Sequence, residues 1–168
     1  MNKETYIKVM DYLSEHKALR KTMVAAERII EISVVAAYFA SLIYALYTSA
    51  GKVLISAVTC LAALYLCTMI RVVADKRRPY EVYDYLPAID KSTKGQSFPS
   101  RHLTSIAVIA ISILSLNVPI GIVFLCLTVV MGALRVLLGV HFIKDVAVGA
   151  AIGIIIGVVG MFVVPRLL

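Results

Sequence analysis

The sequence predicts an all-α integral membrane protein, a helical bundle of about five transmembrane helices preceded by an amphipathic helix at the membrane interface. Hydrophobic residues make up 61% of the 168 residues, and the mean hydropathy is +0.91. That share is far above the roughly 45–50% of an ordinary soluble domain. Uncharged runs of 18 or 19 residues recur along the chain, close to the roughly 20 that cross the hydrocarbon core as a helix.

The N-terminal segment, residues 1–28, mixes lysines, arginines and acids and has no apolar core of the kind found in a signal peptide. Tyr6, Val9, Met10 and Leu13 recur at helical spacing between charged residues. This pattern predicts an amphipathic helix that lies at the membrane surface. A solvated helix or tail is the alternative.

Three spans are predicted directly from uncharged runs: residues 32–50, 53–70 and 146–164. The uncharged run 103–134 is too long for one crossing and contains Pro119, which can begin a helix but would break one. We therefore expect two spans there, the first of them short. Five spans leave no room for a separate soluble domain, so residues 1–168 are expected to form a single domain.

Gly149, Gly153 and Gly157 repeat every four residues in the last predicted span. Such a stripe of small residues lets another helix approach closely. The approaching helix belongs either to the same chain or to a second copy, which would make the protein a homo-oligomer.

The cationic residues are concentrated on one face of the predicted bundle. An odd number of spans places the N-terminal segment, the loop 71–102 and the turn 140–145 on one face. With Arg135 at the end of its span, this face has 15 of the 17 lysines and arginines. Arg71 and Arg135 fall at the ends of apolar helices. An unpaired cation near hydrocarbon is costly, so we expect an anionic partner for both.

Two further clusters contain residues suited to phosphate chemistry. Arg71 and Arg78 are seven residues apart and would share a face if their helix continued. In the segment RVLLGVHFIKD, Gly139 is a plausible helix stop. His141 and Asp145 follow, four residues apart at the start of the last helix. The carboxylate could then hold the imidazole in one tautomer.

The segment SFPSRH, which ends at His102, is the third cluster. Pro99 suits the first turn of a helix, which would leave the backbone N–H groups of Ser100, Arg101 and His102 free to bind an anion. The Ser100 hydroxyl adds a donor. Together these clusters predict a phosphate site in which one histidine attacks phosphorus and the other protonates the leaving oxygen.

The three clusters resemble the signature of the type 2 phosphatidic acid phosphatase family, the membrane branch of a superfamily that also contains vanadium haloperoxidases and acid phosphatases. That signature is a lysine separated by six residues from Arg-Pro, then Pro-Ser-Gly-His, then Ser-Arg with His and Asp at fixed spacing. Here it reads RVVADKRRP from Arg71, PSRH from Pro99 and LRVLLGVHFIKD from Leu134. This chain departs from the signature at three positions: Arg71 stands in place of the lysine, Arg101 in place of the glycine and Leu134 in place of the serine. It also has five predicted spans where the family usually has six.

The resemblance implies a metal-independent lipid phosphatase that forms a phosphohistidine intermediate. His141 would be the nucleophile, Asp145 would orient it, and His102 would be the general acid. The residues implied to hold the phosphoryl oxygens are Arg71, Arg78, Ser100, Arg101 and Arg135. No metal or other cofactor is implied, because the guanidinium groups would supply the charge neutralisation that Mg²⁺ provides in many phosphoryl-transfer enzymes.

The expected partners are the lipid bilayer and a membrane lipid phosphate, and no nucleic acid. Candidate substrates are undecaprenyl diphosphate, phosphatidylglycerol phosphate, phosphatidic acid or another polyprenyl phosphate. A lipid-to-lipid phosphotransferase and a non-catalytic lipid-phosphate binder or transporter are the alternatives. The charge bias predicts a cytoplasmic catalytic face by the positive-inside rule, whereas many bacterial relatives act on the outer face.

Overall fold

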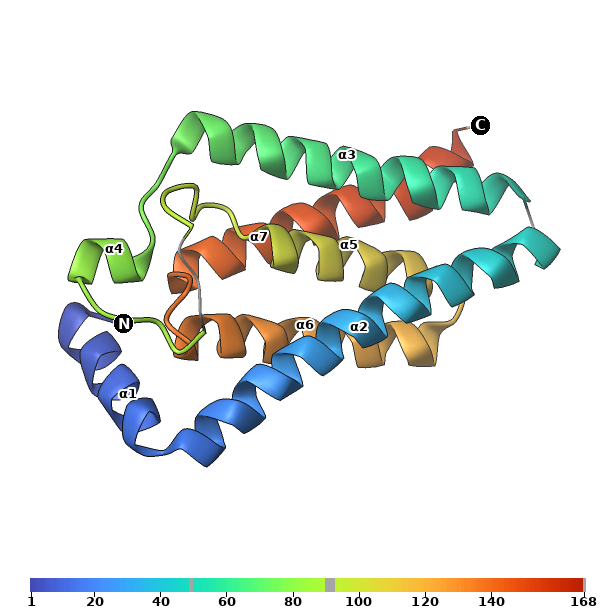
Figure 1. Ribbon diagram of the computed structural model, residues 1–168. Coiled ribbons are helices and arrows are strands. Elements are labelled where there is room, and N and C mark those ends of the chain that lie inside the picture. Colours follow the sequence, from blue (N-terminus) through green and yellow to red (C-terminus); the bar gives the residue numbers. More distant parts are fainter. Residues whose placement is uncertain (49, 90–92, 168) are drawn as a thin grey trace.

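The computed structural model of the protein describes residues 1–48, 50–89 and 93–167, and all regular structure within these ranges is helical (Figure 1). The α-helices are α1 (Lys3–Glu15), α2 (Lys17–Thr48), α3 (Ala50–Ala74), α4 (Pro79–Tyr83), α5 (Arg101–Leu114), α6 (Val118–Leu137) and α7 (Ile143–Val158). The chain continues from α7 through a π-helical segment, η1 (Val159–Val163), and a 3₁₀ turn, η2 (Val164–Arg166).

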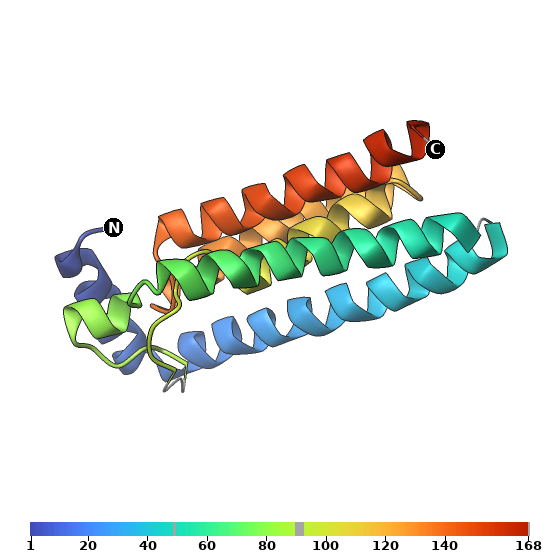
Figure 2. The same ribbon diagram turned by 90° about the horizontal axis from the view of Figure 1, so that it is seen from above.

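The bundle is built around α5, which packs against α2, α3, α6 and α7 (Figures 1 and 2). Helices α2, α3, α6 and α7 with its extension are each long and apolar enough to cross a membrane, and α5 is a shorter apolar helix. Lipid-facing side chains such as Phe39, Leu61 and Val129 are exposed, as expected where hydrocarbon replaces water. The predicted transmembrane helical bundle is confirmed.

The N-terminal amphipathic helix is present as α1, and its apolar stripe is covered by the chain itself. Tyr6, Met10 and Leu13 are buried, the last two in a cluster with Leu138. After a break at His16, α2 begins at Lys17. Residues 17–28 therefore extend the first long helix rather than the interfacial segment to which the sequence pattern assigned them.

The glycine stripe of α7 faces α5 of the same chain. A Cβ atom at Gly149 would lie 2.5 Å from the Ser100 carbonyl oxygen, and one at Gly153 would lie 2.5 Å from that of Thr104. Thr104 also donates its hydroxyl to the Gly149 carbonyl at 2.9 Å. The stripe is filled by an intramolecular neighbour, which is the first of the two alternatives that the sequence left open.

The connections rich in polar residues gather at one end of the bundle. Helix α1, helix α4, the loop that leads to α5 and the α6–α7 turn all lie at this end, at the left of Figure 1. The α2–α3 and α5–α6 connections and the C-terminus lie at the other end (Figures 1 and 2). This is the arrangement that the predicted topology required, and it brings the three sequence motifs together.

Candidate active site

His141 lies in the turn between α6 and α7, close to Asp145 at the start of α7. Both side chains are almost completely buried, with 2% and 0% exposed. The His141 Nδ1 atom lies 3.7 Å from Asp145 Oδ2, an ion-pair distance that is too long for a hydrogen bond. The Phe142 N–H donates to the same carboxylate oxygen at 3.0 Å and holds it at the helix start.

Ser97 bridges the histidine and the carboxylate. Its hydroxyl donates to Asp145 Oδ2 at 2.5 Å, and its oxygen lies 3.4 Å from His141 Nδ1. Because the serine proton goes to the carboxylate, the oxygen is available to accept the Nδ1–H. The Nε2 atom then keeps its lone pair and is the nitrogen that can act as a nucleophile.

The surroundings keep His141 neutral. Burial lowers the pKa of His141 to about 4, and the charges of Arg78 and Arg135 act in the same direction against Asp145. Tyr6 donates its hydroxyl to the His141 carbonyl at 3.1 Å. Burial also raises the pKa of Tyr6 to about 12, so this anchoring hydroxyl stays protonated.

Arg71 and Arg78 reach the site by different routes. Arg71 lies near the end of α3 and donates to the Pro99 carbonyl at 2.8 Å. The condition under which Arg78 would share a helix face with Arg71 is not met, because α3 ends at Ala74 and Arg78 is extended (φ −82°, ψ 160°). The following Pro79 disfavours the α conformation at Arg78.

Loop contacts position Arg78 instead. Its guanidinium donates to the carbonyls of Gly95 at 3.2 Å and Val140 at 3.4 Å. Its backbone N–H donates to Glu81 at 2.8 Å. The Val140 contact places this cation beside His141.

Ser100 lies at the N-terminus of α5, and Pro99 precedes the helix instead of lying in its first turn as the sequence predicted. It is the N-cap residue, and its N–H is not free but donates to the Asp145 carbonyl at 2.9 Å. The open backbone donors are therefore those of the first helical turn, which begins at Arg101. Ser100 is 0% exposed, and its hydroxyl has no hydrogen-bond partner among the described residues.

Two of the remaining predicted residues, Arg135 and His102, contact helix α2. Arg135 is buried and its guanidinium lies 2.8 Å from Glu27. His102 Nε2 lies 3.7 Å from a Glu31 carboxylate oxygen. Arg101 is exposed and lines a groove with His102, so the structure brings every predicted residue to the same end of the bundle.

Four residues of the site were missed by sequence reasoning: Tyr6, Glu27, Glu31 and Ser97. The glutamates are separated from the motifs by a whole transmembrane helix, and the tyrosine was taken only as part of an amphipathic pattern. For the two glutamates a signal did exist, since carboxylates next to a span are costly without a cationic partner. Ser97 is part of the polar segment SFPSRH, but nothing in the sequence shows that it bridges two other residues.

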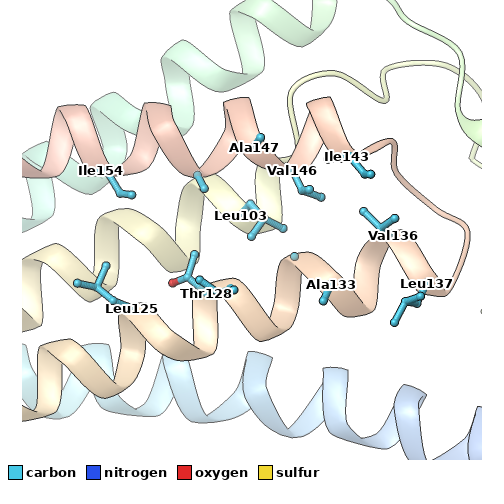
Figure 3. Close-up of a pocket in the computed structure, with 13 residues that line it drawn as sticks. Leu103, Leu125, Thr128, Ala133, Val136, Leu137, Ile143, Val146, Ala147 and Ile154 are labelled. Atoms are coloured by element: carbon cyan, nitrogen blue, oxygen red, sulfur yellow. The ribbon is translucent and has the colours of Figure 1, made fainter. Parts of the chain in front are cut away.

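Two of the cavities along the bundle are formed by α5 and its neighbouring helices. One of about 240 Å³ lies between α2, α3 and α5 and is lined by Val34, Leu64 and Ile106 together with Glu31 and His102. The other, of about 660 Å³, lies between α5, α6 and α7 (Figure 3).

The larger cavity is not suited to phosphate. Its side chains are apolar apart from Thr128, whose hydroxyl donates within its own helix to the Phe124 carbonyl at 2.8 Å. The polar groups are instead at His141 and beside the smaller cavity. Among the described residues, no three His, Cys, Asp or Glu side chains are grouped as metal ligands would be.

A sequence model of the PAP2 superfamily matches residues 52–167, which include all three motifs. The chain belongs to the PAP2 superfamily. Within this superfamily, the chain is similar in fold to LpxE of Aquifex aeolicus, with a TM-score of 0.72 and 23% identity over 94% of this chain and 92% of that one.

A second PAP2 structure, the transmembrane PAP2-type phosphatidylglycerolphosphate phosphatase of Bacillus subtilis, matches with a TM-score of 0.68 and 22% identity. That match covers 89% of this chain and 78% of the other. A search of curated protein sequences returns no match. The family is therefore established by the sequence model, and the two structures support the bundle fold.

Proposed function

We propose that the protein is a membrane lipid phosphatase that uses His141 as its nucleophile. The observation that carries the proposal is the Ser100 hydroxyl, which is completely buried beside Asp145 and has no partner in the described structure. A buried donor without a partner is costly, and a bound phosphoryl oxygen would satisfy it. Arg71 donates to the carbonyl of the preceding residue, so a cation lies beside the same position.

The proposed reaction has two steps. The neutral Nε2 of His141 attacks phosphorus, a P–N bond forms, and the P–O bond to the lipid breaks as His102 gives its proton to the leaving oxygen. Water then attacks the phosphohistidine, His102 takes a proton from it, and the P–N bond breaks to release phosphate and restore His141. Arg71, Arg78 and Arg135 balance the charge on the phosphoryl oxygens.

Asp145 and Ser97 maintain the reactive tautomer of His141 throughout. The imidazolium that forms when Nε2 becomes bonded to phosphorus is stabilised by the Asp145 carboxylate, which lies 3.7 Å from Nδ1. The burial that lowers the pKa of His141 also keeps competing water away from the nucleophile.

The substrate class follows from the groove between α2, α3 and α5. His102 and Arg101 belong to the first turn of α5, and the groove continues from them along Ser105, Ile106 and Ile109. A lipid in the bilayer could place its apolar chain along this groove and its phosphate at the helix end. We propose a phosphate monoester or diphosphate on a lipid, such as phosphatidylglycerol phosphate, phosphatidic acid or undecaprenyl diphosphate.

We further propose that residues 1–168 act as one catalytic domain, with the motifs of residues 71–145 at its active end. The charge bias supports a cytoplasmic position for this end. A reporter fused to the C-terminus, which lies at the other end of the bundle (Figure 1), is then expected to be extracytoplasmic. A cytoplasmic signal from that reporter would reverse the orientation.

The test of the activity is phosphate release by the detergent-purified protein from a panel of these three lipids, without added metal. His141→Ala should abolish release and prevent acid-labile phosphate from being trapped on the protein. His16→Ala is the matched control, because His16 stacks on Tyr12 in an exposed part of the chain and should leave release unchanged. Absence of release from all three lipids by folded wild-type protein would contradict the proposal.

A further inference from the structure

Helix α2 carries two carboxylates one turn apart on the face that packs against the rest of the bundle. Glu27 is buried and Glu31 is partly buried, on the same side as the buried residues Ile30 and Val34. Neither glutamate belongs to a motif of the superfamily signature. Carboxylates beside apolar spans are costly unless they are paired, so their contacts indicate what they do.

The two carboxylates contact two different elements of the site. Glu27 lies 2.8 Å from the Arg135 guanidinium, with both side chains less than a tenth exposed. Glu31 reaches α5, where one of its oxygens lies 3.7 Å from His102 Nε2. Its other oxygen lies 3.6 Å from Arg28, whose side chain is 73% exposed.

The exposure of Arg28 and of His102 indicates which of the two Glu31 contacts is the more important. The Arg28 contact joins an exposed cation to the carboxylate within one helix, and such exposed pairs contribute little. The His102 contact joins two helices in the groove that also contains Arg101, and the His102 side chain is only 31% exposed. The interhelical contact is therefore the one that can orient a functional group.

We propose that Glu31 is the positioning residue of the general acid. Its carboxylate lies 3.7 Å from Nε2 and orients the His102 ring relative to the leaving oxygen of the lipid. This inference rests on the proposed function, in which His102 protonates the leaving group.

The role predicts a dependence on the leaving group that a purely structural role would not produce. An alkoxide is a poor leaving group and needs the proton of His102, whereas a nitrophenolate leaves without it. Glu31→Gln keeps the size of the side chain and removes its charge. We expect kcat/KM for a short-chain phosphatidic acid to fall by about tenfold or more, as part of the 10²–10⁴-fold that general acid catalysis contributes.

The comparison substrate is p-nitrophenyl phosphate, assayed on the same preparations. Its kcat/KM should change less than about twofold, because phosphoryl transfer to His141 needs no acid there. Using kcat/KM confines the comparison to the steps up to phosphoryl transfer, so a slow second step does not obscure it. Arg28→Gln is the matched control, since it removes the other cation beside Glu31 and should change neither substrate.

A double variant tests whether Glu31 acts through His102. In a His102→Ala background, Glu31→Gln should cause no further loss with either substrate, because the group it positions is gone. An equal loss on both substrates, additivity with His102→Ala, or unchanged kcat/KM in Glu31→Gln would each overturn the inference. Failure of the wild-type protein to release phosphate from either substrate would instead refute the proposed function itself.

Discussion

Ser97 is predicted to be the most sensitive small side chain of the site, and Ser97→Ala tests this. Ser97 and Asp145 are both 0% exposed, and their hydrogen bond is 2.5 Å long. Asp145 Oδ1 already has no partner among the described residues. The variant would leave the carboxylate with the Phe142 N–H as its remaining hydrogen-bond donor in that part of the chain.

The cost follows from the charge of the acceptor. A buried hydrogen bond to a charged group contributes about 1.5–3 kcal/mol. At about 2–4 °C per kcal/mol for a chain of this length, thermal unfolding in detergent should occur about 3–12 °C lower. The kcat should fall with KM nearly unchanged, because the imidazole loses its acceptor at Nδ1 while the phosphate contacts remain.

Ser112→Ala is the matched control for this variant. Ser112 is 1% exposed, and its hydroxyl lies 3.8 Å from the Cys60 sulfur rather than against a carboxylate. Its loss should change the unfolding temperature little and leave kcat unchanged. If Ser97→Ala unfolded at the same temperature as Ser112→Ala with wild-type kcat, the bridging role of Ser97 would be refuted.

Three further predictions follow from the buried Glu27–Arg135 pair, the buried His141 and the packing of Gly153 against α5. Glu27→Gln should destabilise the fold by about 3–5 kcal/mol, because it leaves Arg135 buried without its carboxylate. Adding Arg135→Gln should recover part of the lost unfolding temperature. Additive losses in the double variant would contradict the pairing. Because the pKa of His141 is lowered to about 4, protonation should remove the nucleophile only as the pH falls through that value. The acid limb of kcat/KM, corrected for substrate titration, should therefore lie near pH 4. An acid limb at the ordinary histidine value near 6.5 would refute the neutral, buried imidazole. Gly153→Ala should lower the free energy of unfolding by about 1–3 kcal/mol, because the added Cβ overpacks against α5. Gly132→Ala should not, since its added Cβ would have its nearest contact at 3.6 Å. The mass of the purified particle should be the same in both variants, and a change of oligomeric state with Gly153→Ala would contradict the intramolecular contact.

The sequence by itself determined the fold class and the chemical groups of the site. Uncharged runs of 18 or 19 residues match the length of a membrane helix, and a helix satisfies every backbone polar group of its segment within hydrocarbon. The spacing of His141 and Asp145 is a local property of a helix start, and the structure has both at that place. The basic residues of the motifs could be identified because a cation at the end of an apolar span needs an anion.

The tertiary structure decided which residues complete those motifs. Glu27 and Glu31 reach Arg135 and His102 because α2 packs against α5 and α6, and sequence spacing contains no information about that packing. Arg78 takes its position from carbonyls on two distant loops, since a proline follows it and its helix has already ended. The glycine stripe could be recognised from the sequence, but only the packed bundle identified α5 as its partner. Close approach is a property of two helices and not of one.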